Sequence, residues 1–444
     1  MTELSSRNIS PDGITGMILA LDGIKNTVVL LNGPMGCKFY HSTTSQFLTV
    51  RPPMYLPSED GSGRTPVNYN FLNKWFFRQS RVPCTYLDGE DYVYGTTEKV
   101  REALLYLKEQ VAFDLLAVVN SPGASLIGDH LAETAAEVLP ETKTIVLESP
   151  GYSTGFAFGY ETAFRNLAEQ LTLPAPTEKR SRKRVNLLGL SLWQRYWIGD
   201  IEELKRLFEL CNIEVGCCVF AENTVEELAM LRDADLNVVL YPEMASDTAR
   251  YLKERYGVPY YLCPVLPVGF FAVEQIFSEI AGLLGEDAGP LMEESERSRA
   301  FAWSKLDSFH QLCGLPNGAL YAIEGTASQV ISYAKFFSEY LGMIPETLEV
   351  TDGMDGQKRE ALLKLSEQYG IDGKVKTEML QSRADLVFGE ANTIAALKLG
   401  SHPFTGIEIS QPGMGYIDLI PKTQMGIRGT LFLIEQVLNG LQAI

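Results

Sequence analysis

The chain has 444 residues, of which 45% are hydrophobic and 21% are charged. This composition excludes a disordered or fibrous protein, and the length allows two or three domains that each bury a core. The formal net charge is −18 at pH 7, with a pI near 4.8. Such a charge repels nucleic-acid phosphates and anionic membrane surfaces, so we expect neither nucleic acid nor membrane as a partner.

The lack of a visible targeting signal and the pattern of cysteines predict a cytoplasmic protein. The first thirty residues contain no basic stretch that leads into an apolar one, and no segment reaches the roughly 20 apolar residues of a membrane span. The seven cysteines match no zinc spacing. In a cytoplasmic chain they are better explained as buried thiols or metal ligands than as a disulfide framework.

Short apolar runs that end in Gly, Ser, Asn or Pro alternate with segments of helical period along the chain. This alternation is expected of parallel strands joined by crossover helices. Strands are predicted at residues 27–33, 115–121, 144–149, 185–191, 237–242 and 385–390. Helices are predicted at residues 101–110, 200–211, 246–257, 325–342 and 391–400. Ligands of such sheets lie beyond the carboxyl ends of the strands, so the strand-to-loop junctions are where chemistry is expected.

Two changes in composition divide the chain. Residues 175–184 form a basic, polar linker, and residues 294–305 form a charged helical stretch. We therefore predict an α/β protein with three Rossmann-like, parallel-sheet domains of ordinary size. Their predicted bounds are residues 1–175, 185–293 and 306–444, and the last ends in an amphipathic helix at 428–441.

The junction with the clearest functional motif is the turn after the first strand, in the sequence VVLLNGPMGCKFYHS. Gly33 and Gly36 allow a ligand to approach the backbone closely, and Cys37 follows at the start of a helix. Because a helix N-terminus stabilises a thiolate, Cys37 is a candidate metal ligand, and the alternative is an inert buried thiol. The spacing of a P-loop is absent, so this chain is not expected to hydrolyse ATP.

The turn LNGPMGC resembles the cluster-binding turn of the nitrogenase component 1 family. Four further stretches resemble segments of that family in the same order: residues 84–104, 118–131, 149–163 and 185–215. The resemblance covers nearly the whole chain. It implies a nitrogenase component 1-like fold and a reductase that works with an iron–sulfur cluster.

The resemblance also implies which residues hold that cluster. Of three cysteines usual in the family, only Cys37 is kept, because the others fall around Ile9 and Ser10 and on Ser121, which we expect to be a hydrogen-bonding neighbour. Cys84 stands where nitrogenase subunits usually carry Ser or Thr. A [4Fe–4S] cluster takes four thiolates, so our hypothesis is one cluster that bridges a dimer through Cys37 and Cys84 of each chain. The alternative for Cys84 is a buried small side chain.

The family alignment also bears on the substrate. Tyr241 falls at the cysteine and Met425 at the histidine that hold the nitrogenase cofactor, so we do not expect dinitrogen reduction. Trp193 and Trp197, in the loop after strand 185–191, would instead form an aromatic wall for an organic, tetrapyrrole-like substrate. The alternative is that these aromatic side chains pack between domains.

His41, next to the proposed cluster, is the candidate proton donor, and the alternative is a structural histidine. The resemblance implies an ATP-dependent iron–sulfur reductase protein as electron donor, and a homodimer or a heteromer with a sister subunit. Two other functions stay open: a scaffold for metallocluster assembly, and a non-catalytic partner subunit. Cys263 and Cys313 have no role that the sequence assigns.

Overall fold

The computed structural model describes residues 11–38, 56–57, 64–65, 82–111, 113–148, 154–173, 180–368, 378–411 and 418–443. The chain divides into two compact units. The N-terminal unit comprises Pro11–Ala175 and Val219–Arg232, and the C-terminal unit includes Pro176–Cys218 and Asp233–Ile444. The predicted α/β class with parallel sheets is confirmed. The bounds of three separate domains stay a prediction.

The N-terminal unit is built on a parallel sheet of order β1-β4-β5. Its strands are β1 (Thr27–Asn32), β4 (Leu115–Asn120) and β5 (Lys143–Leu147). The helical segments of this unit are α1 (Gly13–Asp22), η1 (Met35–Lys38), α3 (Asp91–Tyr94), α4 (Thr97–Gln110), α5 (Pro122–Ser125), α6 (Leu131–Val138), α7 (Phe156–Gln170) and η4 (Glu227–Leu231). A short antiparallel pair joins β2 (Leu56–Pro57) to β3 (Arg64–Thr65).

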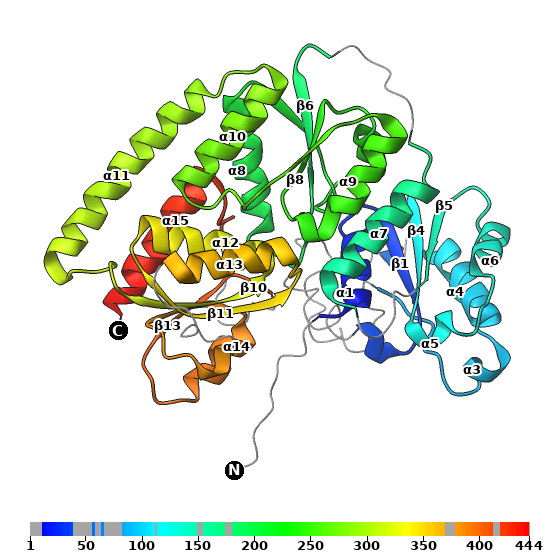
Figure 1. Ribbon diagram of the computed structural model, residues 1–444. Coiled ribbons are helices and arrows are strands. Elements are labelled where there is room, and N and C mark those ends of the chain that lie inside the picture. The colour runs from blue at the N-terminus through cyan, green and yellow to red at the C-terminus, as the bar shows by residue number, and fades with distance from the viewer. Residues whose placement is uncertain are drawn as a thin grey trace. The chain divides into compact units, whose positions relative to one another are not determined.

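Helices cover both sides of this sheet, as expected for strands that are apolar throughout (Figure 1). One face packs on α4 and α6 through a buried aliphatic cluster that includes Leu30, Leu116 and Leu104. On the other side α1 contacts β1 and β4, and α7 contacts β5. The central strand is therefore buried on both faces, and functional side chains are left to its carboxyl end.

Two glycines bring α1 and α7 into backbone contact. A Cβ added at Gly16 would lie 2.1 Å from the Phe156 carbonyl oxygen, and one added at Gly159 would lie 1.8 Å from the Gly13 carbonyl oxygen. No side chain larger than hydrogen fits at either position. Helix α7 also carries Tyr160, whose ring packs edge-on at 5.2 Å against Phe220 of the returning segment 219–232.

We expect Gly159→Ala to lower the free energy of unfolding by about 2 kcal/mol or more, because overpacking forces the two helices apart. Gly282→Ala is the matched control, since an added Cβ at this position inside a helix meets no atom within 4 Å. That control should gain about 0.5–1 kcal/mol from the lower entropy of the unfolded chain. Urea unfolding of the purified chains measures both changes, and equal midpoints would contradict the contact.

The C-terminal unit contains two parallel sheets, of order β7-β6-β8-β9 and β11-β10-β12-β13. The strands are β6 (Lys183–Leu188), β7 (Ile213–Cys218), β8 (Leu236–Val239), β9 (Tyr260–Leu262), β10 (Leu320–Thr326), β11 (Ile344–Asp352), β12 (Leu386–Gly389) and β13 (Thr405–Glu408). The helical segments are α8 (Trp197–Leu210), α9 (Pro242–Tyr256), α10 (Phe270–Leu284), α11 (Gly289–Cys313), α12 (Ala327–Lys335), η5 (Phe336–Tyr340), α13 (Gly356–Gln368), η6 (Met379–Gln381), α14 (Ala391–Lys398) and α15 (Gly426–Gln442).

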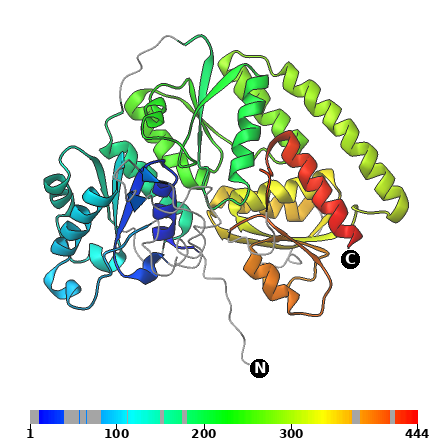
Figure 2. The ribbon, with the colours of Figure 1, turned by 180° about the vertical axis from the view of Figure 1, so that it is seen from behind.

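The last helix ties the two sheets of this unit together. Figure 2 shows α15 beside α8 and α11, and α15 also packs against β12 and β13. Its buried face includes Ile427, Ile434 and Val437 at helical spacing. Among the described helices, none combines the length and the apolar character that a membrane crossing requires.

Candidate functional site

The turn that carries Cys37 begins where β1 ends. Asn32 is the last residue of the strand, and the Gly33 N–H donates a hydrogen bond of 3.0 Å to Thr85 Oγ1. Cys37 lies in η1, and its own N–H donates to the Pro34 carbonyl at 3.2 Å. The thiol thus stands just beyond the carboxyl end of an edge strand, as the sequence predicted for the junction.

Residues 82–87 run beside β1 and place Cys84 there. The Leu31 N–H donates to the Pro83 carbonyl at 3.0 Å, and the Thr85 N–H donates to the Leu31 carbonyl at 3.0 Å. Cys84 therefore forms a parallel bridge with Leu31. Its side chain is buried, and it is a neighbour of the turn although the two lie far apart in sequence.

A buried polar network holds these pieces in register. Asn32 Nδ2 donates to Asn120 Oδ1 at 2.8 Å and to Thr96 Oγ1 at 2.9 Å. Thr85 Oγ1 donates to Asn32 Oδ1 at 2.9 Å. Asn120 Nδ2 in turn donates to both carboxylate oxygens of Glu148 at 3.0 Å. Because buried amides are costly when unpaired, this network fixes the carboxyl ends of β1 and β4 relative to the Cys84 segment.

Ser121, which is predicted to align with a cluster cysteine, also lies at this turn. A Cβ added at Gly33 would come within 2.7 Å of the Ser121 Cβ, so glycine is required for the two segments to approach. The Ser121 hydroxyl accepts a hydrogen bond of 3.4 Å from the Ala124 N–H, and Ser121 is thus the N-cap of α5. Its predicted role beside a cluster stays a prediction.

Burial and nearby charges act on the pKa of the Cys37 thiol. Burial raises this pKa, and the charges of Asp12 and Cys84 raise it further. Stabilisation of the thiolate by a following helix stays a prediction, because residues 39–55 lie outside the described ranges. Any metal bound by Cys37 must displace the thiol proton.

The described residues leave room beside the turn. None of their atoms lies within 4 Å of an added Cβ at Gly36, and Met35 is exposed. A cavity of about 300 Å³ borders Cys84 and is also lined by Pro83, Lys99 and Tyr106. Within the described ranges, no three His, Cys, Asp or Glu side chains gather as a metal-binding group. Cys37 and Cys84 are therefore the candidate ligands near the end of β1.

Comparison with known proteins identifies the family. A family model described as nitrogenase component 1 type oxidoreductase matches residues 13–442. The chain belongs to this family. The resemblance stated from the LNGPMGC turn is thereby confirmed.

Curated relatives of the chain include subunits of light-independent protochlorophyllide reductase. The chain is 31% identical over 279 residues to a light-independent protochlorophyllide reductase subunit of Synechococcus sp. (strain WH7803), a match that covers 60% of this chain and 51% of the relative. It is 27% identical over 318 residues to the corresponding subunit of Methylocella silvestris, a match that covers 70% of this chain and 60% of the relative. The chain thus matches about half the length of these curated relatives.

A solved structure shares the fold over nearly the full length. "Nitrogenase Cp1 at pH 6.5" superposes with a TM-score of 0.75 at 20% sequence identity, covering 98% of this chain and 92% of the other. At this identity the likeness supports the fold alone.

The two positions predicted to align with the family's cofactor ligands are filled by core side chains. Tyr241 and Met425 are both fully buried. The Met425 N–H donates to Asp200 Oδ1 at 3.2 Å, and Asp200 also accepts from the Thr423 hydroxyl at 2.8 Å. Burial raises the pKa of Asp200 to about 6. These residues therefore anchor the chain before α15 and offer no thiol or imidazole.

The aromatic side chains after β6 are packed inside the C-terminal unit. Trp193 and Trp197 are 8% and 4% exposed. Between them, the Tyr196 hydroxyl donates to the Glu408 carbonyl at 2.9 Å, and its ring meets Phe432 edge-on at 5.4 Å. The packing interpretation accounts for these contacts of Tyr196. A substrate wall of Trp193 and Trp197 stays a prediction, and His41 lies outside the described residues.

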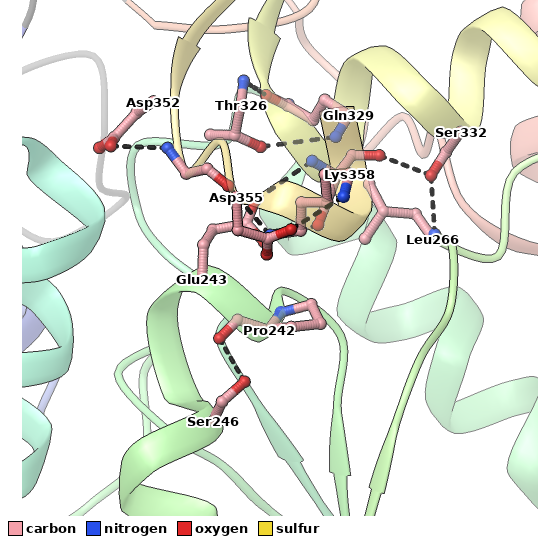
Figure 3. A network of polar contacts seen from close by, with 12 residues as sticks. Pro242, Glu243, Ser246, Leu266, Thr326, Gln329, Ser332, Asp352, Asp355 and Lys358 are labelled. Atoms are coloured by element: carbon pink, nitrogen blue, oxygen red, sulfur yellow. Dashed lines mark hydrogen bonds and ion pairs between the residues drawn. The ribbon is translucent and has the colours of Figure 1, made fainter. Parts of the chain in front are cut away.

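An ion pair that the sequence analysis missed joins the two sheets of the C-terminal unit (Figure 3). Glu243, in the first turn of α9, accepts hydrogen bonds from the Ser328 hydroxyl at 2.6 Å and from Lys358 Nζ at 3.0 Å. The glutamate side chain is 3% exposed. A charged residue directly after predicted strand 237–242 was the available signal, but its partners lie 85 and 115 residues away.

A buried glutamate, Glu324, and a half-buried one, Glu390, lie toward the carboxyl ends of β10 and β12. Glu324, in β10, accepts from the Glu390 N–H at 2.8 Å and from the Thr393 hydroxyl at 3.1 Å. Burial raises the pKa of Glu324 to about 7, and burial together with the neighbouring Glu324 charge raises that of Glu390 to about 8. Both carboxyl groups are therefore partly protonated near neutral pH.

We expect the stability of the protein to depend on Glu324 between pH 4.5 and pH 7. The folded pKa of about 7 lies above the ordinary value of 4.5, so stability is fully present below pH 4.5 and is lost as pH rises through 7. Glu324→Gln removes this loss, on the order of 3 kcal/mol, and should gain stability relative to the natural chain as pH rises from 5 to 8. Urea unfolding at several pH values measures the difference. The exposed Glu98→Gln should show no such trend, and a flat difference for Glu324→Gln would contradict the raised pKa.

Proposed function

We propose that this chain is the catalytic component 1 of a nitrogenase-like reductase that acts on an organic substrate and not on dinitrogen. Electrons would arrive from an ATP-dependent iron–sulfur reductase protein through a [4Fe–4S] cluster. The observation that carries the proposal is that Cys37 follows the end of β1 and Cys84 forms a bridge with Leu31 of the same strand, in a member of an oxidoreductase family.

The residues at this turn fit half of such a cluster. A [4Fe–4S] cluster takes four thiolates, and one chain supplies two, so a second copy or a sister subunit would complete the set. None of the described residues lies within 4 Å of a Cβ added at Gly36, and Gly33 lets the Ser121 segment approach. When bound, the cluster supplies one-electron transfer. The chain's own part is to hold the iron through Cys37 and Cys84, which give up their protons on binding.

The substrate proposed is tetrapyrrole-like. Relatives carry the name of a protochlorophyllide reductase, and the buried Tyr241 and Met425 leave no thiol or imidazole at the aligned cofactor positions. Trp193 and Trp197 remain the proposed aromatic contacts. His41 is the proposed proton donor, because imidazole titrates near neutrality and this residue follows the cluster turn by four positions.

Iron content tests the cluster. After anaerobic reconstitution with iron and sulfide, we expect about four iron atoms per dimer in the natural chain. Cys37→Ala and Cys84→Ala should each lower the iron content and change the electron paramagnetic resonance spectrum of the reduced protein. Cys313→Ala, an exposed thiol outside the turn, is the control and should retain both.

The two cysteine variants test different parts of the proposal. Unchanged iron and spectrum in Cys84→Ala would remove Cys84 from the site and return it to a packing role. A colourless, iron-free natural chain, or a Cys37→Ala chain with full iron, would overturn the redox proposal itself.

Proton donation by His41 is tested by turnover. With protochlorophyllide as the trial tetrapyrrole, a reduced iron–sulfur reductase protein and ATP, His41→Ala should lower kcat by roughly 10²–10⁴-fold, because a positioned acid contributes that much. Its iron content should stay unchanged. His130→Ala is the control, and activity that survives in His41→Ala would exclude the acid role.

A further inference from the structure

We propose that the C-terminal unit contains a separate binding site for a neutral molecule with a single aromatic ring. The site is a cavity of about 130 Å³ between the start of α10 and η5. It contains none of the residues proposed to hold the cluster, the substrate or the proton. The inference therefore does not rest on the proposed function.

Aromatic rings form the walls of this cavity. Phe270, Phe271, Phe336 and Tyr340 all line it. The rings of Phe336 and Tyr340 are stacked at 5.7 Å with an angle of 21°, and Phe271 meets Tyr340 edge-on at 5.9 Å. Rings in such arrangements attract a further ring in an offset or edge-on position. Phe271 is exposed, and the guanidinium of Arg299, which pairs with Glu274, lies 5.1 Å from the centroid of its ring.

The backbone builds these walls before any ligand binds. Gly269 has a φ of +86°, and a Cβ there would lie 2.5 Å from Phe336 Cδ2, so only glycine allows the ring its position. The Gly269 N–H donates to the Thr430 hydroxyl at 3.1 Å. Figure 3 shows the second hydrogen bond, which the Leu266 N–H donates to the Ser332 hydroxyl at 2.8 Å. The π-helical turn η5 then presents Phe336 and Tyr340. Such π-helical turns occur often at functional sites.

Size restricts the occupant to one ring. An engineered apolar cavity of about 150 Å³ in another protein holds benzene, so about 130 Å³ accepts a single ring and excludes a tetrapyrrole. Charge restricts it further. Lys335 and Glu339 line the cavity and carry opposite charges. Gln275 and Ser332 add neutral polar groups. A neutral ring with one hydroxyl group, as in a phenol, matches this mixed lining.

Binding of 4-fluorophenol to the purified full chain tests the proposal by ¹⁹F nuclear magnetic resonance. We expect saturable binding to the natural chain. Ala272→Phe, which fills the cavity, should raise the Kd at least tenfold. Leu283→Phe adds the same ring at an exposed position near the other end of α10 and should bind as the natural chain does. The smaller Ala272→Val serves if Ala272→Phe does not fold, and circular dichroism confirms the fold of each variant.

The charged analogue 4-fluorobenzoate should bind at least tenfold more weakly than 4-fluorophenol. Equal affinity of the two would overturn the neutral ligand class. No saturation by 4-fluorophenol up to its solubility limit, or equal Kd values for the natural chain and a folded Ala272 variant, would overturn the site.

Discussion

The candidate cluster site depends on the buried side-chain amide of Asn32. Its nitrogen donates to Asn120 and Thr96, and its oxygen accepts from Thr85, so one residue joins the ends of β1 and β4 to the segment that carries Cys84. Each of these groups is buried, and losing any partner would leave an unpaired amide or hydroxyl at a cost of about 1–3 kcal/mol. The position of Cys84 beside the Cys37 turn is a consequence of this pairing.

Burial also decides the charge state of the groups at the sheet ends. It raises the pKa of the Cys37 thiol, and it raises those of the Asp200 and Glu324 carboxyl groups. The hydrogen bonds that Asp200 accepts lower the pKa of its carboxyl group, but by less than burial raises it. At Cys37 the neighbouring negative charges act in the same direction as burial, so an electropositive iron centre is the partner that would favour its thiolate form.

The C-terminal unit closes its strand ends with its own side chains. Glu243 and Lys358 pair at the end of β8, and Asp200 holds the chain before α15. Tyr241 and Met425, at the positions predicted to align with the family's cofactor ligands, are fully buried. The aromatic cavity at Phe336 is preformed because Gly269 and η5 shape it from the backbone.

Local sequence was enough to predict several of the parallel strands, the Gly33 and Gly36 turn with Cys37, and the family, because these rest on apolar runs and short motifs. The strands that it missed include β11, whose alternating sequence IPETLEVTD lacks a continuous apolar run. Three further features required the folded chain: Thr85 meets Gly33 across 52 residues, segment 219–232 belongs to the N-terminal unit, and burial raises the pKa of Cys37. Contacts between distant segments and the burial they create have no local signature, since they form only when the separate strands and helices pack together.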